Sequence, residues 1–397
     1  MNPPVIVYGD VDARAVEQLE RCAQTGGALR GVLCADGHVG YSQPIGGAVA
    51  YPDHISPSGV GFDIACGNKA ARTNLLADDV RGDMPRLMDA IFERITFGVG
   101  RRNEEPVDHP VLDRIRHADF EPQRRLRDLA ARQLGTVGAG NHYVDLFEGD
   151  DGHVWIGVHF GSRGFGHRTA GGFLALAQGL PFDGHARQMG MDSPPALLRT
   201  DSELGRSYIA AMQLAGEYAY AGRDTVVEKV LEILGAEPLY EVHNHHNFAW
   251  RERHFGTDVW VVRKGCTPAF PGQEGFVGAT MGEPSVILRG KDGDASRELL
   301  YSTVHGAGRV MSRTQAAGKR RKGKQVKPGL IDYRAVRAEL AAGGIELRGG
   351  AADEAPGAYK RLDAVLAAHA ETIEVVHRLR PIGVAMAGAD TFDPYRD

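Results

Sequence analysis

The sequence contains few cysteines. Four occur in 397 residues, and no two of them stand in the CxxC pairing that is typical of zinc sites. They are also too sparse for a disulfide scaffold, which normally stabilises small secreted domains. Reduced thiols in a cytoplasmic protein are therefore expected at Cys22, Cys34, Cys66 and Cys266.

Long apolar runs are absent as well. No window approaches the roughly 20 apolar residues that a membrane helix needs. The first ten residues, MNPPVIVYGD, lack the basic stretch followed by an apolar run that marks a secretion signal. The sequence therefore predicts a soluble protein with no membrane partner.

The net charge is small, at −5. This value argues against general nucleic-acid binding through total charge, although a local basic surface stays open. Residues 318–327 read GKRRKGKQVK and supply such a surface. This segment either extends a track for nucleic-acid phosphates or forms a mobile, solvated loop.

Internal repeats and Ser/Pro-rich linkers are not visible, which favours one large domain over residues 1–397. Helical and strand-like patterns alternate irregularly, so we expect an α+β fold of layered mixed sheets flanked by helices. Residues 1 to about 30 are expected at the periphery, and the tail after about 318 as a lid-like addition. Surface helices are predicted over 12–24, 123–134, 203–234 and 357–379, and strands over 31–41, 46–52, 153–162, 258–265 and 285–290.

Glycine is abundant, with 52 residues. The glycines cluster beside His, Asp, Cys, Asn and Arg, as in SGVGFDIACG, GTVGAGNH and HGAGR. Glycine lets a backbone turn sharply and approach a ligand closely. Each cluster alone is a tight turn, but together they indicate strand ends that converge on one site.

One such cluster places Asp63 and Cys66 three positions apart. A carboxylate and a thiolate at this spacing can bind one metal ion, or two if the sulfur bridges them. Histidine ligands must then come from elsewhere, and the candidates are His142, His159 and His246. Each of these taken alone is more often a structural residue, and the ligand types leave Mn, Fe, Co and Zn open.

Nine motifs together resemble the RtcB family of RNA-splicing ligases, in the same order, from about residue 35 to about residue 384. The motif-bearing core is expected over about 31–388. The motifs are DGHVGYSQPIGGAVAY, SPSGVGFDIACG, GTVGAGNHYVDL, VHFGSRGFGHR, HHNF, RKGCTPAFPG, STVHGAGRVMSR, DEAPGAYK and RPIGV.

The resemblance implies a GTP- and Mn²⁺-dependent enzyme. Such enzymes join RNA ending in a 2′,3′-cyclic phosphate or 3′-phosphate to RNA beginning with a 5′-hydroxyl. It assigns Cys66 as a thiolate shared by two Mn²⁺ ions, with Asp63 and His142 on one ion and His159 and His246 on the other. The neighbouring His245 is the alternative to His246.

The same resemblance assigns the nucleophile to His305 in HGAGR, which would form a histidine–GMP intermediate. Asp36 would hold the other ring nitrogen and fix the tautomer. Phosphate contacts with RNA are implied for Arg163, Arg309 and Arg313.

The nucleotide pocket departs from the family pattern. The resemblance places Asn141, Thr280, Ser285 and Tyr359 around the nucleotide. However, Asp145 stands where a glutamate is usual, and Met386 stands near the position of the usual C-terminal lysine. A methionine cannot donate a hydrogen bond to guanine O6, so the nucleotide preference is expected to be relaxed, unless the tail beyond Gly388 supplies a substitute.

Two alternatives to the ligase stay open. One is an RtcB-like enzyme that processes or caps RNA or DNA ends with altered nucleotide preference. The other is a metal-bearing RNA-binding protein without catalysis, which the retained His305 and metal ligands disfavour. A monomer is expected, and the sequence does not distinguish tRNA splicing from RNA repair.

Overall fold

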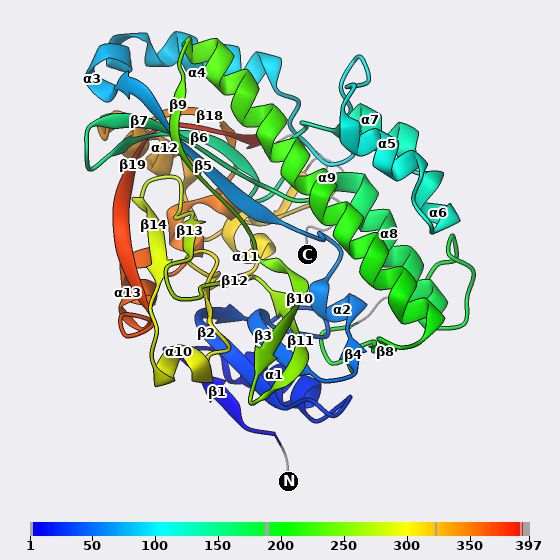
Figure 1. The fold of residues 1–397 in the computed structure, drawn as a ribbon. Coiled ribbons are helices and arrows are strands. Elements are labelled where there is room, and N and C mark those ends of the chain that lie inside the picture. The colour runs from blue at the N-terminus through cyan, green and yellow to red at the C-terminus, as the bar shows by residue number, and fades with distance from the viewer. Residues whose placement is uncertain (1–2, 187–189, 322–323, 390, 392–397) are drawn as a thin grey trace.

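The computed structural model describes residues 3–186, 190–321, 324–389 and 391. It is an α+β fold in which two sheets pack together and helices cover their outer faces (Figure 1). The helices are α1 (Ala13–Ala23), α2 (Pro57–Val60), α3 (Ala77–Val80), α4 (Met84–Arg94), α5 (Pro110–Arg116), α6 (Glu121–Arg124), α7 (Arg127–Gln133), α8 (Arg163–Ala177), α9 (Glu203–Leu234), α10 (Asp294–Glu298), α11 (Arg313–Ala317), α12 (Tyr333–Ala342) and α13 (Leu362–Ala367).

The strands alternate with these helices without a regular repeat, as the sequence predicted. They are β1 (Val5–Val7), β2 (Arg30–His38), β3 (Ile45–Tyr51), β4 (His54–Ile55), β5 (Gly67–Leu76), β6 (Tyr143–Gly149), β7 (His153–Phe160), β8 (Leu198–Arg199), β9 (Pro238–His245), β10 (Asn247–His254), β11 (Thr257–Lys264), β12 (Cys266–Pro268), β13 (Glu274–Val277), β14 (Ser285–Gly290), β15 (Ser302–Val304), β16 (Lys319–Arg321), β17 (Lys324–Lys327), β18 (Glu346–Gly350) and β19 (Ile373–Gly388).

The larger sheet has eight strands in the order β13-β14-β19-β6-β7-β5-β9, with β18 paired to β19. Helices α4 and α9 cover one face, where Met88, Ile91 and Val226 pack against Ile156 and Val158 of β7. The other face packs against α12 through Leu340. Because both faces are covered, β7 is buried along almost its whole length, as in the run VWIGVHF.

The smaller sheet has five strands in the order β1-β2-β3-β11-β10. One apolar cluster joins it to the larger sheet, since Val32 and Val261 share that cluster with Val286 and Leu288 of β14. Helix α1 covers another part of the sheet through Leu19, which is fully buried. The Asp12 side chain accepts a hydrogen bond from the Arg14 amide and starts this helix.

Most predicted elements are confirmed. Helix α9 begins and ends at the predicted residues, and each of the five predicted strands overlaps an observed one. The helix predicted over 357–379 is wrong in its second half, because α13 ends at Ala367 and β19 begins at Ile373. The apolar residues of this stretch satisfy both spacings, and pairing with β14 and β6 selects the strand.

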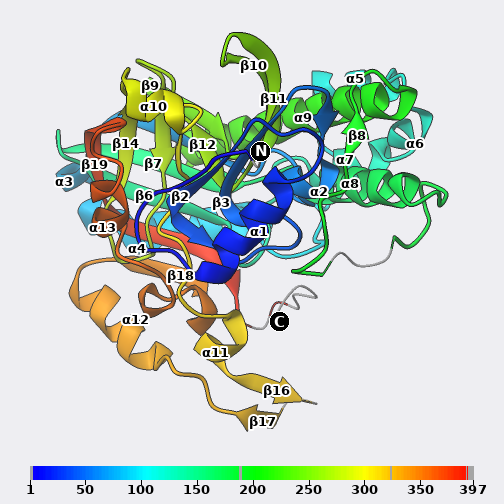
Figure 2. The ribbon, with the colours of Figure 1, turned by 90° about the horizontal axis from the view of Figure 1, so that it is seen from below.

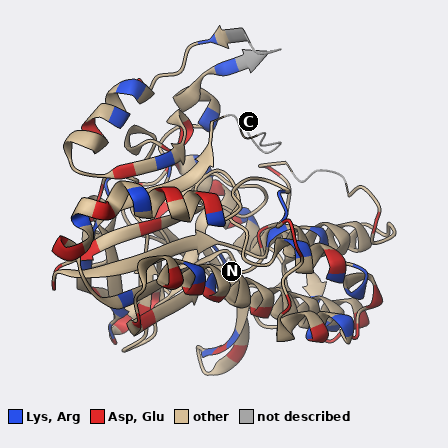
Figure 3. Cartoon of the chain, turned by 90° about the horizontal axis from the view of Figure 1, so that it is seen from above, with Lys and Arg blue, Asp and Glu red and all other residues tan. Residues whose placement is uncertain are grey.

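The tail after residue 318 is not a lid-like addition, because β18 and β19 belong to the larger sheet. The basic segment 318–327 contains the antiparallel pair β16 and β17, which projects from the body beside α11 (Figure 2). Residues 322–323 lie outside the described part, and the mobility of this segment stays a prediction. Figure 3 shows basic and acidic residues interspersed over most of the chain. Over the described ranges, no helix combines the length and apolar character that crossing a membrane requires.

Candidate metal and nucleotide site

Four neighbouring strands of the larger sheet bring the predicted metal ligands together at one end of the strands. Cys66 directly precedes β5, His142 directly precedes β6, His159 lies near the end of β7, and His246 directly follows β9. These strands are adjacent in the order β6-β7-β5-β9. Strand register therefore places side chains together that are up to 180 positions apart, from Cys66 to His246.

Two clusters of ligand atoms share the sulfur of Cys66. One contains Asp63, Cys66 and His142, the other Cys66, His159 and His246, and the ligand atoms of each lie within 4.8 Å of one another. Cys66 Sγ is 3.6 Å from Nε2 of both His142 and His159, and His142 Nε2 is 3.1 Å from Asp63 Oδ2. One sulfur therefore belongs to both candidate clusters.

The chemistry of these groups fits bound cations. Burial, together with Asp63, raises the pKa of the Cys66 thiol well above its ordinary value, and a nearby cation acts in the opposite direction. Within the described residues, the buried Nδ1 of His246 has no hydrogen-bond partner. Asn68 Oδ1 lies 2.6 Å from Nδ1 of His159, which fixes the ring so that Nε2 faces Cys66.

His245 points away from this cluster. Its Nδ1 is 3.3 Å from a guanidinium nitrogen of Arg223, and its ring stacks on Phe248 at 4.9 Å. Successive side chains of a strand alternate between the two faces, so only one of two neighbouring histidines can face Cys66. The structure brings His246, the residue predicted from the sequence, into the cluster.

Arg223 of α9 is fully buried behind the ligands, and sequence reasoning missed it. Its guanidinium donates to the backbone oxygens of Ala65 at 3.0 Å and Phe160 at 2.7 Å, the residues adjacent to Cys66 and His159. It also contacts His245, adjacent to His246. One side chain therefore holds three backbone segments that carry candidate ligands.

Glycine is required where the backbone passes close to the ligands. A Cβ atom at Gly161 would lie 2.2 Å from Asp63 Oδ1, and one at Gly138 would lie 2.2 Å from His142 Nδ1. Both distances are too short for any side chain. Two of the glycine clusters in the sequence, around Gly138 and Gly161, therefore lie against candidate ligands.

His305 and Asp36 form a closely held pair beside this cluster. His305 Nδ1 lies 2.5 Å from Asp36 Oδ2, which also accepts a hydrogen bond from the His305 amide at 2.9 Å. Burial acts to raise the pKa of Asp36, but charge and hydrogen-bond interactions with His305 outweigh it and hold that pKa below its usual value. The His305 ring is 4.9 Å from that of His246. A histidine with one nitrogen fixed by a carboxylate therefore adjoins the metal ligands.

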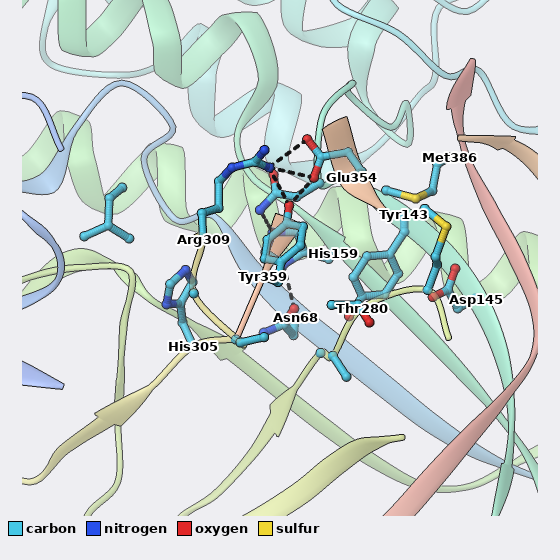
Figure 4. A pocket seen from close by; sticks show the side chains of 18 of the residues that line it. Asn68, Tyr143, Asp145, His159, Thr280, His305, Arg309, Glu354, Tyr359 and Met386 are labelled. Carbon is cyan, nitrogen blue, oxygen red and sulfur yellow. Dashed lines mark hydrogen bonds and ion pairs between the residues drawn. The ribbon is translucent and has the colours of Figure 1, made fainter. Parts of the chain in front are cut away.

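A cavity of about 300 Å³ opens in front of His305. In Figure 4, His305 lies at one end, Asp145 and Met386 lie at the other, and Tyr359 and Thr280 lie between them. Asn141 also lines it, whereas Ser285 is not among the lining residues. The buried Ser285 hydroxyl instead accepts a hydrogen bond from the Ala279 amide at 3.0 Å and supports the cavity wall.

Buried polar atoms face this cavity without partners. Within the described part of the chain, Asp145 Oδ1, Thr280 Oγ1 and the Tyr143 hydroxyl have no hydrogen-bond partner. Such atoms are costly unless a ligand or water satisfies them. Burial raises the pKa of the Asp145 carboxyl well above its ordinary value and favours the neutral acid, which can donate a hydrogen bond.

Glu354 is a second residue that sequence reasoning missed, although it lies in the quoted motif DEAPGAYK. It is buried, contacts the Tyr359 hydroxyl and pairs with Arg309 at 3.3 Å and Arg313 at 3.5 Å. Arg309 also donates a hydrogen bond to the backbone oxygen of Asp353 at 2.7 Å, and its guanidinium lies 4.9 Å from the centre of the Tyr359 ring. Glu354 and Arg309 therefore fix the position of Tyr359 in the cavity wall.

A second cavity, of about 390 Å³, lies against the Asp63 and His142 side of the metal ligands. Arg163 and Arg313 line it, and Arg163 begins α8 with a φ of +52°. Asn141 and Arg313 line both cavities. The two cavities thus meet at the ligand cluster.

Comparisons with known proteins identify the family of this chain. A family model described as tRNA-splicing ligase RtcB matches residues 18–387. An RNA-splicing ligase RtcB of Escherichia coli strain K12 is 31% identical, with 96% of this chain and 97% of that protein covered. A tRNA-splicing ligase RtcB of Thermococcus kodakarensis is 31% identical over 97% of this chain and 95% of its own length, and one of Archaeoglobus fulgidus is 32% identical over 94% and 90%. The chain therefore belongs to the RtcB family of tRNA-splicing ligases.

Proposed function

We propose that this chain is a GTP- and Mn²⁺-dependent RNA ligase. It joins RNA ending in a 2′,3′-cyclic phosphate or 3′-phosphate to RNA beginning with a 5′-hydroxyl. The single observation that carries the proposal is the His305–Asp36 contact of 2.5 Å at one end of a nucleotide-sized cavity, beside the ligand cluster. Family membership supports the reaction class.

His305 is the proposed nucleophile. Because the protonated Nδ1 donates a hydrogen bond to the Asp36 carboxylate, the free lone pair is on Nε2. Nε2 attacks the α-phosphorus of GTP, the bond to the β-phosphate oxygen breaks, and pyrophosphate leaves. Water first opens a 2′,3′-cyclic phosphate to the 3′-phosphate. The GMP then passes from His305 to the RNA 3′-phosphate. The 5′-hydroxyl oxygen attacks the phosphorus of that RNA phosphate, so the new phosphodiester forms and GMP leaves.

Two Mn²⁺ ions would be held by the two clusters that share Cys66, and would offset the negative charge of the reacting phosphates. Asn141, Asp145, Thr280 and Tyr359 are the proposed nucleotide contacts, with Ser285 behind them. Arg163 and Arg313 are proposed to bind RNA phosphates. Arg309 would reach a phosphate only by giving up a contact with Glu354 or Tyr359.

The remaining proposals concern the molecule as a whole. The chain is proposed to act as a monomer. The cysteines of the described residues are free and buried, which supports a reducing compartment such as the cytoplasm. End processing or capping with altered nucleotide preference is the second candidate, favoured by Asp145 and Met386 at the far end of the cavity.

Covalent labelling tests the proposal. Wild-type protein with Mn²⁺ and GTP labelled at the α-phosphate should become radioactive, and His305→Ala should not. A ligation assay with defined RNA ends then distinguishes joining from end processing. Label retained by His305→Ala, or no label on the wild type, would reject the histidine–GMP mechanism.

A further inference from the structure

The second cavity contains an aromatic surface that no step above uses. Phe62 and His167 stack with ring centroids 5.1 Å apart and planes inclined by 25°, and both line this cavity. Phe62 directly precedes the candidate ligand Asp63 and is 40% exposed. Elsewhere in the core, large aromatic rings such as Phe160 and Phe165 are fully buried.

Positive charge surrounds this aromatic pair. Among the described residues that line the cavity, three are arginines, Arg163, Arg168 and Arg313, and one is a carboxylate, Asp63. Nε of Arg163 is buried and has no hydrogen-bond partner within the described chain. A partly buried guanidinium beside an exposed phenylalanine ring and a half-buried histidine ring favours an anionic ligand that also has a flat apolar face.

Nucleic acid has both properties. Proteins bind single strands by stacking bases on aromatic side chains while cations hold the backbone phosphates, and such stacking tolerates any base. A small anion would leave the aromatic pair unused, and an apolar ligand would leave the arginines unused. The cavity volume of about 390 Å³ suits one nucleotide rather than a folded segment of a protein partner.

The position of the cavity relates it to the reaction. It reaches the candidate ligands His142 and Asp63, and it shares Asn141 and Arg313 with the nucleotide cavity. A nucleotide seated on the rings of Phe62 and His167 would place its sugar and phosphate next to the ligand cluster. The joining step of the proposed ligase needs an RNA end at that place.

We propose that Phe62 and His167 form a stacking platform for the terminal base of a single-stranded RNA end, with Arg163 and Arg168 against its phosphates. This inference rests on the proposed ligase function. It names the residues that hold the RNA end, whether that end carries the 3′-phosphate or the 5′-hydroxyl. Any of the four bases fits, because the platform reads a ring face and not a base edge.

Fluorescence of 2-aminopurine tests the platform, because stacking quenches this base. Two short RNAs are used, one with 2-aminopurine beside a 3′-phosphate and one with it beside a 5′-hydroxyl. They are titrated with full-length protein and Mn²⁺ in the absence of GTP. Wild-type protein should quench at least one of them, and that RNA identifies the end that the platform binds.

Phe62→Ala should remove the quenching and weaken binding of the same RNA about 5- to 150-fold, which corresponds to the loss of about 1–3 kcal/mol of stacking. Phe62→Tyr should retain both. Phe255→Ala is the matched control, since Phe255 is also exposed and lies under an arginine, Arg30, but lines neither cavity. It should bind like the wild type.

Manganese content and melting temperature check each variant for an intact fold. If Phe62→Ala loses metal, His167→Ala on α8 replaces it, because that residue lies outside the Asp63 loop. Unquenched RNA with wild-type protein, or equal quenching by wild type and the platform variants, would overturn the inference. GTP labelling of wild-type protein is scored separately, so failure of the ligase mechanism is distinguishable from failure of the platform.

Discussion

At the scale of single residues, Cys66 is the residue that the two ligand clusters share. Cys66→Ala is predicted to abolish binding of both Mn²⁺ ions and labelling by GTP, because its sulfur belongs to both coordination spheres. Elemental analysis of the purified variant measures this directly. Cys22→Ala, Cys34→Ala and Cys266→Ala are the matched controls, since these thiols are equally buried but lie outside both clusters. Unchanged metal content in Cys66→Ala would reject the bridge.

The carboxylate of Asp36 has a role that a change of one atom can test. Asp36→Asn can still accept the amide hydrogen bond from His305, but it removes the charge that holds the Nδ1 proton. Orienting and protonation effects of this kind amount to about 10²- to 10⁴-fold in rate. We predict a fall of this size in the rate of GTP labelling, measured in single turnover. A rate equal to that of the wild type would show that the tautomer is set by other groups.

Met386 tests the base preference. A lysine here could donate a charge-assisted hydrogen bond to guanine O6, which is worth roughly 1.5–3 kcal/mol. Compared with a lysine-bearing relative, the preference for GTP over ATP should be lower by about one to two orders of magnitude. Competition between the two nucleotides for labelling of His305 measures the ratio.

Met386→Lys should restore part of that preference. The new ammonium would lie beside Asp145 and would favour the ionised form of this buried carboxyl. The cavity would then contain both an ammonium and a carboxylate to bind the edge of guanine. An unaltered ratio in this variant would mean that another group reads the base. The tail after Gly388 that was considered for this role lies largely outside the described residues.

At the scale of elements, α9 connects the body of the protein to the ligands through Arg223. Arg223→Lys keeps the charge but offers one donor centre in place of a guanidinium fork that reaches Ala65, Phe160 and His245. We predict that Mn²⁺ affinity falls about 10- to 100-fold, the usual effect of removing support behind a metal ligand. In Co²⁺-loaded protein, the thiolate-to-metal absorption band should shift.

Arg263→Lys is the control for that prediction. Arg263 is also fully buried, but it pairs with Glu252 in the smaller sheet and contacts no candidate ligand. Both variants should lower the melting temperature, and only Arg223→Lys should change metal affinity and the cobalt spectrum. Equal metal affinity in the two variants would reduce Arg223 to a packing role.

The elements also show how far a sequence can predict this structure. Strands at 153–162 and 258–265 follow from local pattern, and α9 follows from 32 residues of helical spacing. The helix prediction fails at residues 373–379, because their apolar spacing fits a helix as well as a strand. Pairing with β14, which is far away in the chain, selects the strand. The candidate ligands follow from family motifs, whereas the roles of Asn68, Arg223 and Glu354 depend on contacts between segments far apart in the chain.

At the scale of the whole molecule, the candidate ligands come from four strands and the Asp63 loop. Cations that bind only the folded state should therefore stabilise it, by about 2.7 kcal/mol for one site at 100 times its Kd. We predict that Mn²⁺ raises the melting temperature by a few degrees and that a chelator reverses the rise. Cys66→Ala should show neither effect, and a similar rise in that variant would mean that the ions bind elsewhere.

The place of β19 in the larger sheet has a consequence for synthesis on the ribosome. It follows every other described strand in the chain, yet it lies between β14 and β6. Until Gly388 leaves the ribosome, the nascent chain carries two sheet fragments with open edges, which are prone to aggregation and are typical chaperone substrates. Met386 arrives with the same strand, so an unfinished chain also lacks one wall of the nucleotide cavity. The larger sheet and this wall of the cavity are therefore completed together, when β19 is added.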